Sequence, residues 1–180
     1  MGANLPSPAG EPVATFLAVR PLLTALLLPL GAPLCWSPLH RTAPDGGPPG
    51  QPDYLNAVVL VRQLSAAALV QAEVAAPALL AELQDLEQRF ARRRDQRWGP
   101  RSLDLDLLWW GELTAGSDSL QLPHPRLLER SFVLAPLAAI DPGLRPPGAA
   151  AAADALLGLL LAHHDGPAPQ RLAGRPGWPE

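Results

Sequence analysis

Apolar residues recur at helical spacing in the first part of the chain. Intervals of three and four residues place six of them on one helical face: Val13, Phe16, Leu17, Leu23, Leu26 and Leu27. Pro21 lacks the backbone N–H that an uninterrupted helix needs. We therefore expect either one kinked helix or a pair of helices over residues 12–28.

Two segments downstream have the composition of strands. Leu34 to Thr42 carries aromatic and alternating residues, and Tyr54 to Val61 is apolar and β-branched. Between them, Pro44–Gly50 consists of Pro, Gly and Asp, which favour turns. The pattern predicts two strands joined by a long loop, and long loops are usually functional or disordered.

The second half of the chain alternates between helical and extended patterns. Ser65 to about Arg94 is rich in Ala, Leu, Glu and Gln, which predicts one long helix or two helices broken at Pro77. Beyond it we expect a strand over Leu103–Trp110, a short strand over Leu120–Leu122, a mostly helical stretch over Pro125–Ile140 despite Pro136, a helix over Ala149–His163, and a loose tail to Glu180.

Composition limits the chain to one ordinary domain. Its 180 residues, 48% hydrophobic and 17% charged, are enough to bury a single core. Cys35 has no partner for an internal disulfide, so we expect a cytoplasmic location. The apolar run Pro21–Leu30 is too short and too interrupted by Pro to span a membrane, and we interpret it as a buried helix.

The charges are unevenly distributed. The net charge is −3 and all fourteen basic residues are Arg. Six of them gather in one short window: Arg89, Arg92, Arg93, Arg94, Arg97 and Arg101. The planar guanidinium group suits phosphate recognition. A solvated helix end is the alternative interpretation of this cluster.

Asp104 and Asp106 follow the Arg cluster directly. Strict alternation in Leu103–Leu107 places both carboxylates on one face of a strand and the leucines on the other. Adjacent carboxylates repel, so a site that keeps both ionised favours a cation beside them, and oxygen ligands favour Mg²⁺. Taken alone, so short a motif more often marks an edge strand with one solvated face.

The acid pair and the Arg cluster together favour polyphosphate transfer. Metal ions and guanidinium groups both neutralise charge on a transferred phosphoryl group. The chain contains no Gly-x-x-x-x-Gly-Lys-Ser/Thr loop, which excludes a P-loop enzyme. A nucleic-acid-binding module is the alternative from another class, but the net acidic charge and the adjacent carboxylates argue against it.

The stretch Arg97–Leu108 resembles the signature of the 6-hydroxymethyl-7,8-dihydropterin pyrophosphokinase family. The resemblance extends in order over roughly residues 4–142, through Arg41-Thr42, Gln51 to Ala57, Gln84 with Glu87, Leu122 to Pro125, and Arg130 to Phe132. Ordered matches of this kind are far more specific than any single motif. The chain is therefore identified as a member of this family.

The resemblance implies a reaction and a fold. Pyrophosphate passes from ATP to the hydroxymethyl group of the pterin, in tetrahydrofolate biosynthesis, and AMP is released. The implied fold is an α+β ferredoxin-like sandwich, a mainly antiparallel sheet flanked by helices, over residues 1–142. Residues 143–180 would form a C-terminal helix and a loose Pro/Gly/Ala-rich tail. Only Gly2–Leu5 remains of the family's opening segment, so we expect a truncated first strand and a translation start upstream of Met1.

The resemblance also implies roles for individual residues. Asp104 and Asp106 would bind two Mg²⁺ ions that bridge the ATP phosphates. Four arginines would bind or close over the triphosphate: Arg92, Arg94, Arg97 and Arg101. Other ATP contacts would come from Gln84, Trp98, His124 and Arg130. The pterin would be held by Tyr54 and Phe132, which stack on it, by Asn56 at its polar edge and by the Thr42 backbone. Catalysis would rest on Arg92, Arg101, Asp104 and Asp106.

Some of these residues also have ordinary structural interpretations. Without the family context, Tyr54 and Phe132 would be core aromatics and His124 a surface turn residue. Asp45 stands where relatives usually carry an apolar residue, and Ala43 where Pro is common, which predicts an altered pterin affinity. The alternative function is a truncated, catalytically impaired member that still binds nucleotide. We expect a monomer that acts on small molecules, with no nucleic acid or membrane partner.

Overall fold

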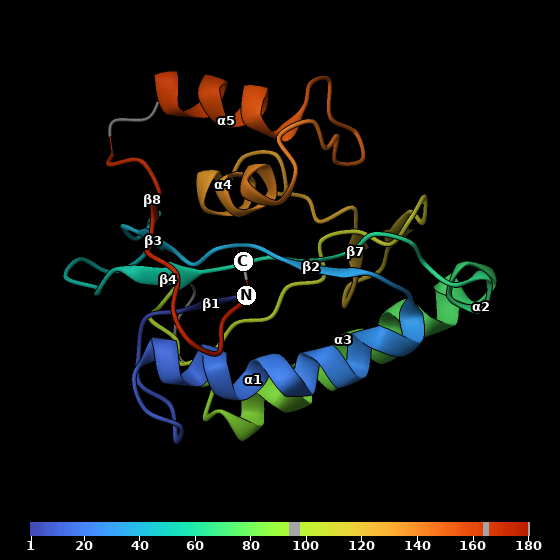
Figure 1. Cartoon of the computed structure of the whole chain (residues 1–180), viewed down its shortest axis with the longest axis horizontal. Coiled ribbons are helices and arrows are strands. Elements are labelled where there is room, and N and C mark those ends of the chain that lie inside the picture. Colours follow the sequence, from blue (N-terminus) through green and yellow to red (C-terminus); the bar gives the residue numbers. More distant parts are fainter. Residues whose placement is uncertain (94–97, 164–165, 180) are drawn as a thin grey trace.

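The structure is a computed structural model that describes residues 1–93, 98–163 and 166–179. Strands occupy its middle layer (Figure 1). Helices α1 (Pro12–Leu27) and α3 (Ala72–Arg89) lie side by side against one face, α4 (Ser131–Ile140) covers the other, and α5 (Ala153–Ala162) packs on the outer side of α4. The protein is thus an α+β structure, as the sequence predicts, with the sheet enclosed between two helical layers.

All strand pairs among the described residues are antiparallel. The main sheet has the order β1-β4-β3-β8, formed by Gly2–Ala3 (β1), Tyr54–Asn56 (β4), His40–Thr42 (β3) and Gln170–Arg171 (β8). Further along the same two segments, β2 (Leu34–Trp36) pairs with β5 (Val59–Val61). The two predicted strands therefore form, each in two pieces.

Helix α1 continues through Pro21, so one helix forms instead of two. Phe16 and Val19 on its inner face are completely buried in the main core. Together with the 3₁₀ turn η1 (Leu28–Leu30), the segment Pro12–Leu30 is long and apolar enough to cross a membrane, by length and composition alone. The core helix of a globular protein and an N-terminal signal sequence pass the same test, and 28% of this span is buried, on the inner face of α1.

The predicted long helix is divided in two, at Gln71 and not at Pro77. Helix α2 (Ala66–Val70) begins after Ser65, whose hydroxyl accepts a hydrogen bond from the Ala68 N–H at 3.2 Å. Pro77 lies inside α3. Proline removes one intrahelical hydrogen bond at this position, and α3 continues through it.

The segment Leu103–Trp110 is not a strand, contrary to the prediction. Its β-bridge among the described residues joins Asp104 to Gly2, through N–H···O bonds of 2.8 and 2.9 Å. Because β1 has only two residues, it is too short to form a ladder with this segment. The predicted alternation holds nevertheless, since Leu103 and Leu105 are buried in the core.

The C-terminal half adds a second apolar core. Helices α4 and α5 pack on each other around Leu127, Leu134 and Leu137. Helix α4 begins only at Ser131, and the residues from Pro125 onward form turns instead of the predicted helix. One cause is that the His124 ring accepts a hydrogen bond from the Arg126 N–H, which holds the chain in a turn.

Two short strands precede α4. Strand β6 (Ala115–Gly116) pairs with β7 (Gln121–Leu122), so the predicted short strand is present.

The chain end predicted to be loose is attached to the sheet. Strand β8 pairs with β3, and Trp178 is buried. The Trp178 indole donates a hydrogen bond to the Ser37 carbonyl at 2.8 Å. Its ring lies 5.8 Å from that of Phe16 and 5.4 Å from that of Trp36, between centroids. Burying so large an aromatic surface offsets the entropy of ordering the tail.

Candidate active site

A pocket opens where β1, β3 and β4 meet the loop around Trp98 and the start of α4. Nine of the residues predicted to bind substrates or metal line it: Thr42, Tyr54, Asn56, Trp98, Arg101, Asp104, Asp106, Arg130 and Phe132. Residues up to 90 positions apart thus converge on one small space. In particular, both carboxylates of the alternating motif face the same pocket, as predicted.

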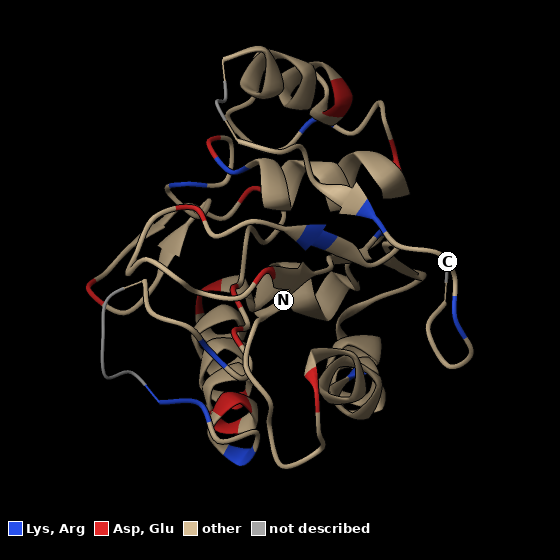
Figure 2. Ribbon diagram, turned by 90° about the vertical axis from the view of Figure 1, so that its left-hand side faces the viewer, with Lys and Arg blue, Asp and Glu red and all other residues tan. Residues whose placement is uncertain are grey.

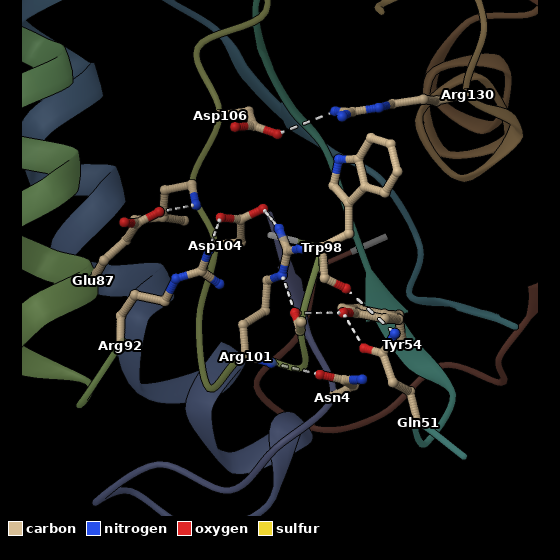
Figure 3. Close-up of polar contacts among 12 residues, drawn as sticks. Asn4, Gln51, Tyr54, Glu87, Arg92, Trp98, Arg101, Asp104, Asp106 and Arg130 are labelled. Carbon is tan, nitrogen blue, oxygen red and sulfur yellow. Dashed lines mark hydrogen bonds and ion pairs between the residues drawn. The ribbon is translucent and has the colours of Figure 1, made fainter. Parts of the chain in front are cut away.

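Asp104 lies between two arginines (Figure 3). One of its oxygens is 3.1 Å from Arg92 Nη2, and the other is 2.5 Å from Arg101 Nη1. Burial is the largest single influence on Arg101 and lowers its pKa, but the electrostatic interactions and hydrogen bonds with Asp104 and Tyr54 together outweigh it and leave that pKa above its ordinary value. Arg101 is therefore a permanent cation on the pocket wall.

Among the residues that the structure describes, Asp106 pairs with Arg130, at a longer distance of 3.5 Å. Burial lowers the pKa of Arg130, and the negative charge of Asp106 opposes that shift. The Arg130 guanidinium also lies 5.4 Å from the centre of the Phe132 ring. It thus connects the acidic side of the pocket with its aromatic side.

The aromatic side is built from β3, β4 and the start of α4. Asn56 and Thr42 are buried on neighbouring strands, and Asn56 Nδ2 donates to Thr42 Oγ1 at 2.7 Å. This bond fixes the orientation of the amide, with its oxygen beside Gly2. A Cβ atom at Gly2 would lie 3.0 Å from Asn56 Oδ1, so even Ala would crowd this amide. The Tyr54 ring faces the same space, with Arg101 at 5.6 Å from its centre.

Trp98 lies at the mouth of the pocket, 47% exposed and with φ of +57°. Its carbonyl accepts a hydrogen bond from Gln51 Nε2 at 3.3 Å. The Tyr54 hydroxyl donates to Gln51 Oε1 and to the Gly99 carbonyl, at 3.1 and 3.2 Å. These bonds tie the long loop before β4 to the segment that carries Trp98 (Figure 3).

Not all predicted residues lie in the pocket. Gln84 is exposed on α3 and is not among the lining residues. His124 lies behind the pocket, where burial and then the nearby arginines lower its pKa while Asp106 opposes them. Arg92 reaches the site through Asp104 without lining the pocket. Arg94 and Arg97 fall outside the described residues.

Two supporting residues were not predicted as part of the site. Glu87 is 3% exposed, and its Oε1 accepts the Leu105 N–H at 2.8 Å, which fixes the backbone between the two carboxylates. Asn4 Oδ1 accepts the Arg101 N–H at 2.7 Å. A signal for Glu87 exists in the sequence, because this acid follows Leu83 and Leu86 on the apolar face of its helix.

A larger cavity of about 470 Å³ adjoins the pocket and has mostly apolar walls. Leucines of α1 and α3 form one side, and residues 58–62 and 105–112 the other. The Met1 ammonium lies at its edge and donates to the Ala57 carbonyl at 2.8 Å. Burial lowers the pKa of this amine, opposed by the charges of Asp106, Asp104 and Glu87. Figure 2 shows acidic segments next to the N-terminus.

Comparisons with known proteins agree on one family. A family model described as 7,8-dihydro-6-hydroxymethylpterin-pyrophosphokinase matches residues 1–142. The chain is 37% identical over 147 residues to a 2-amino-4-hydroxy-6-hydroxymethyldihydropteridine pyrophosphokinase of Pseudomonas aeruginosa, covering 82% of this chain and 81% of that protein. A protein of the same name from Haemophilus influenzae is 34% identical over 137 residues, 76% of each chain. One from Synechocystis is 44% identical over 96 residues, 53% of this chain and 44% of the relative.

Proposed function

Because the chain belongs to the 7,8-dihydro-6-hydroxymethylpterin-pyrophosphokinase family, we propose that its polar pocket transfers pyrophosphate from ATP to 6-hydroxymethyl-7,8-dihydropterin. The substrate hydroxyl oxygen attacks the β-phosphorus, the bond from that phosphorus to the α-phosphate oxygen breaks, and AMP leaves. The hydroxyl proton passes to solvent. The observation that carries the proposal is the pocket itself, which combines three carboxylates, three arginines and an aromatic wall.

The pterin is assigned to the aromatic side of the pocket. A flat heteroaromatic ring gains from stacking on Tyr54 and Phe132. Its amide-like edge needs both a donor and an acceptor, which the Asn56 side chain and the Thr42 backbone supply. The bond from Asn56 to Thr42 supports this assignment, because it leaves the Asn56 oxygen directed away from Thr42.

The triphosphate is assigned to the side that holds the arginines. Arg92, Arg101 and Arg130 already meet carboxylates there, and phosphate oxygens replace a carboxylate without loss of charge pairing. Arg94 and Arg97 complete this set by sequence resemblance alone. Guanidinium groups fixed in this way stabilise charge that develops on the transferred group and its leaving oxygen.

Two Mg²⁺ ions are assigned to Asp104 and Asp106. The donor chemistry fits, because both groups are carboxylates and both face one pocket. The described residues contain no group of three or more His, Cys, Asp or Glu that suits a metal. The protein would thus supply few ligands and leave the other positions to water and phosphate oxygens, as Mg²⁺ prefers. Bound Mg²⁺ supplies charge neutralisation on the phosphates.

The remaining ATP contacts are assigned to Gln84, Trp98 and His124. Trp98 is supported by its place at the pocket mouth. His124 is supported by its electrostatic interaction with Asp106 and Arg130. Gln84 rests on the sequence resemblance alone, since its side chain is exposed on α3.

The reaction is tested by incubating the protein with ATP, Mg²⁺ and the hydroxymethyldihydropterin and measuring AMP. We expect AMP in equal amount to the pterin diphosphate, and none without the pterin. Folded protein that binds ATP without forming AMP would instead support an impaired member of the family. Equilibrium dialysis with labelled ATP distinguishes that outcome from the loss of all binding.

We further propose that residues 1–142 form a ferredoxin-like sandwich. The antiparallel pairs β1–β4, β3–β4 and β2–β5, with helices on both faces, support this arrangement. The hydrogen bond from the Arg62 N–H to Pro33 and the β2–β5 register direct the Val59 and Val61 N–H groups away from β2, toward the apolar cavity. Both should exchange their amide hydrogens faster than Leu60, whereas equal protection of all three would contradict this strand register.

We also propose that the protein acts as a cytoplasmic monomer on small molecules, without nucleic acid or membrane. The pocket supports the small-molecule part of this proposal, because its polar and aromatic side chains converge on a space of about 100 Å³. The burial of the inner face of α1 in the core supports it as well. Light scattering with and without ATP measures the oligomeric state, and a dimer would contradict the proposal.

A further inference from the structure

The mouth of the pocket carries an ion pair that the proposed chemistry does not use. Asp45, in the Pro/Gly-rich loop before β4, lies 3.5 Å from Arg126 Nη2. The Arg126 guanidinium carbon lies 5.8 Å from the centre of the Trp98 ring. Asp45, Arg126 and Trp98 come from three separate segments, and all three line the pocket.

The backbone around this group is closely packed. Gln51 Nε2 donates to the carbonyls of Gly46 and Trp98, at 3.2 and 3.3 Å. A Cβ atom on Gly47 would lie 2.3 Å from the Trp98 carbonyl oxygen, so this approach requires glycine. The loop that carries Asp45 therefore lies directly against the segment that carries Trp98.

Arg126 has a second acidic neighbour, which clarifies what Asp45 does. Glu129 lies 3.6 Å from Arg126 Nε, one helical turn along the same segment, and is the more exposed of the two acids. An arginine paired with Glu129 alone would have no link to the loop before β4. Asp45 supplies that link, and it holds the guanidinium where a cation–π contact with Trp98 is made.

We propose that Asp45 is a positioning residue that, through Arg126, holds Trp98 over the mouth of the pocket and so retains the bound pterin. The proposal rests on the function proposed above. Asp45 and Arg126 are both partly exposed, so their attraction is modest and is screened by salt. The contact among Asp45, Arg126 and Trp98 therefore affects the affinity for the substrate more than the rate of the chemical step.

The test compares two substitutions that each remove one negative charge beside Arg126. D45N breaks the link to the loop, and E129Q is the matched control that leaves it intact. At low salt we expect D45N to raise the pterin KM by about two- to five-fold with kcat nearly unchanged, and E129Q to change neither. At about 0.5 M salt, the difference between D45N and the unmodified protein should disappear.

A second readout follows Trp98 without using activity. Acrylamide quenching, corrected with W98F for the other four tryptophans, should show Trp98 more accessible in D45N than in E129Q or the unmodified protein. Equal quenching and equal KM in D45N and the unmodified protein would overturn the proposal, as would equal effects of the two substitutions. If the unmodified protein forms no AMP, the proposed function fails. Acrylamide quenching still tests whether Asp45 positions Trp98 through Arg126.

Discussion

Two adjoining cavities share Met1, Val58, Asp106 and Leu108 but differ in volume and in the chemistry of their other walls. The smaller, of about 100 Å³, is walled by charged and hydrogen-bonded side chains. The larger, of about 470 Å³, is walled mainly by Leu and Val. The comparison teaches that charged side chains are more concentrated in the smaller of the two cavities than in the larger. Polar groups held at fixed positions can act on a substrate, whereas apolar walls offer it only burial.

The two cavities also differ in how they are closed. Ion pairs fill the small pocket, and a phosphate or a metal ion can exchange with either partner of such a pair. The large cavity is bounded by side chains that pack from α1, α3 and the sheet. Substitutions in the two places should therefore act on different quantities, turnover in the first and stability in the second.

The largest effect is expected for the acids of the small pocket. Asp104→Asn and Asp106→Asn should each lower AMP formation by about 10²–10³-fold, because each removes charge that the transfer requires. Asp118→Asn, in the exposed turn between β6 and β7, is the control and should retain full activity. Near-normal turnover in both pocket variants would contradict the metal assignment.

A smaller effect is expected for the buried acid behind the pocket. Glu87→Leu leaves the Leu105 N–H without its acceptor and should lower the free energy of unfolding by about 1–3 kcal/mol. Glu87→Gln keeps an acceptor oxygen and should recover most of that stability. Urea denaturation measures both, and equal loss in the two variants would show that the hydrogen bond is not the cause.

Loss of stacking should affect one substrate only. Phe132→Leu should raise the KM for the pterin by about two- to ten-fold and leave the KM for ATP unchanged, since an aromatic contact contributes about 0.5–1.5 kcal/mol. Phe90→Leu, a buried aromatic outside the pocket, is the matched control. An equal rise in both KM values would show that Phe132 supports the fold in general and does not bind the pterin specifically.

The smallest effect is expected in the apolar cavity. Leu83→Phe adds volume where space is available, so the free energy of unfolding should change by less than about 1 kcal/mol. The same change at Leu134, completely buried in the second core, should cost about 1–3 kcal/mol. Thermal unfolding compares the two, and an equal cost would mean that the cavity is closed in solution.

Short-range sequence patterns predicted which helices and strands form better than they predicted where each one begins and ends. The apolar period over α1 and the two strand-like segments were identified correctly, because local propensity and burial agree there. The segment 103–110 was assigned as a strand from the same kind of pattern, yet a ladder depends on a partner elsewhere in the chain. The attached tail likewise depends on tertiary contacts.

The residues of the candidate site were also predicted only in part from local patterns. Alternation alone predicts that Asp104 and Asp106 share a face, and the structure confirms it. The residues proposed to recognise the pterin were identified only by the family resemblance, because Tyr54 and Phe132 have no local pattern that distinguishes them from core aromatics. Asn4 acts through the backbone of a distant residue, and such a contact leaves no periodic trace in the sequence. Glu87 also acts through a distant backbone group, but its place on the apolar face of α3 does mark it.

The bond from Trp178 to Ser37 joins residues 141 positions apart. Such a contact closes a long loop, and folds rich in distant contacts form slowly. During synthesis, Trp178 must leave the ribosome before it can form the aromatic cluster with Phe16 and Trp36. The core around α1 is therefore completed after translation of residue 178 and not along the way, and until then its apolar face is available to chaperones.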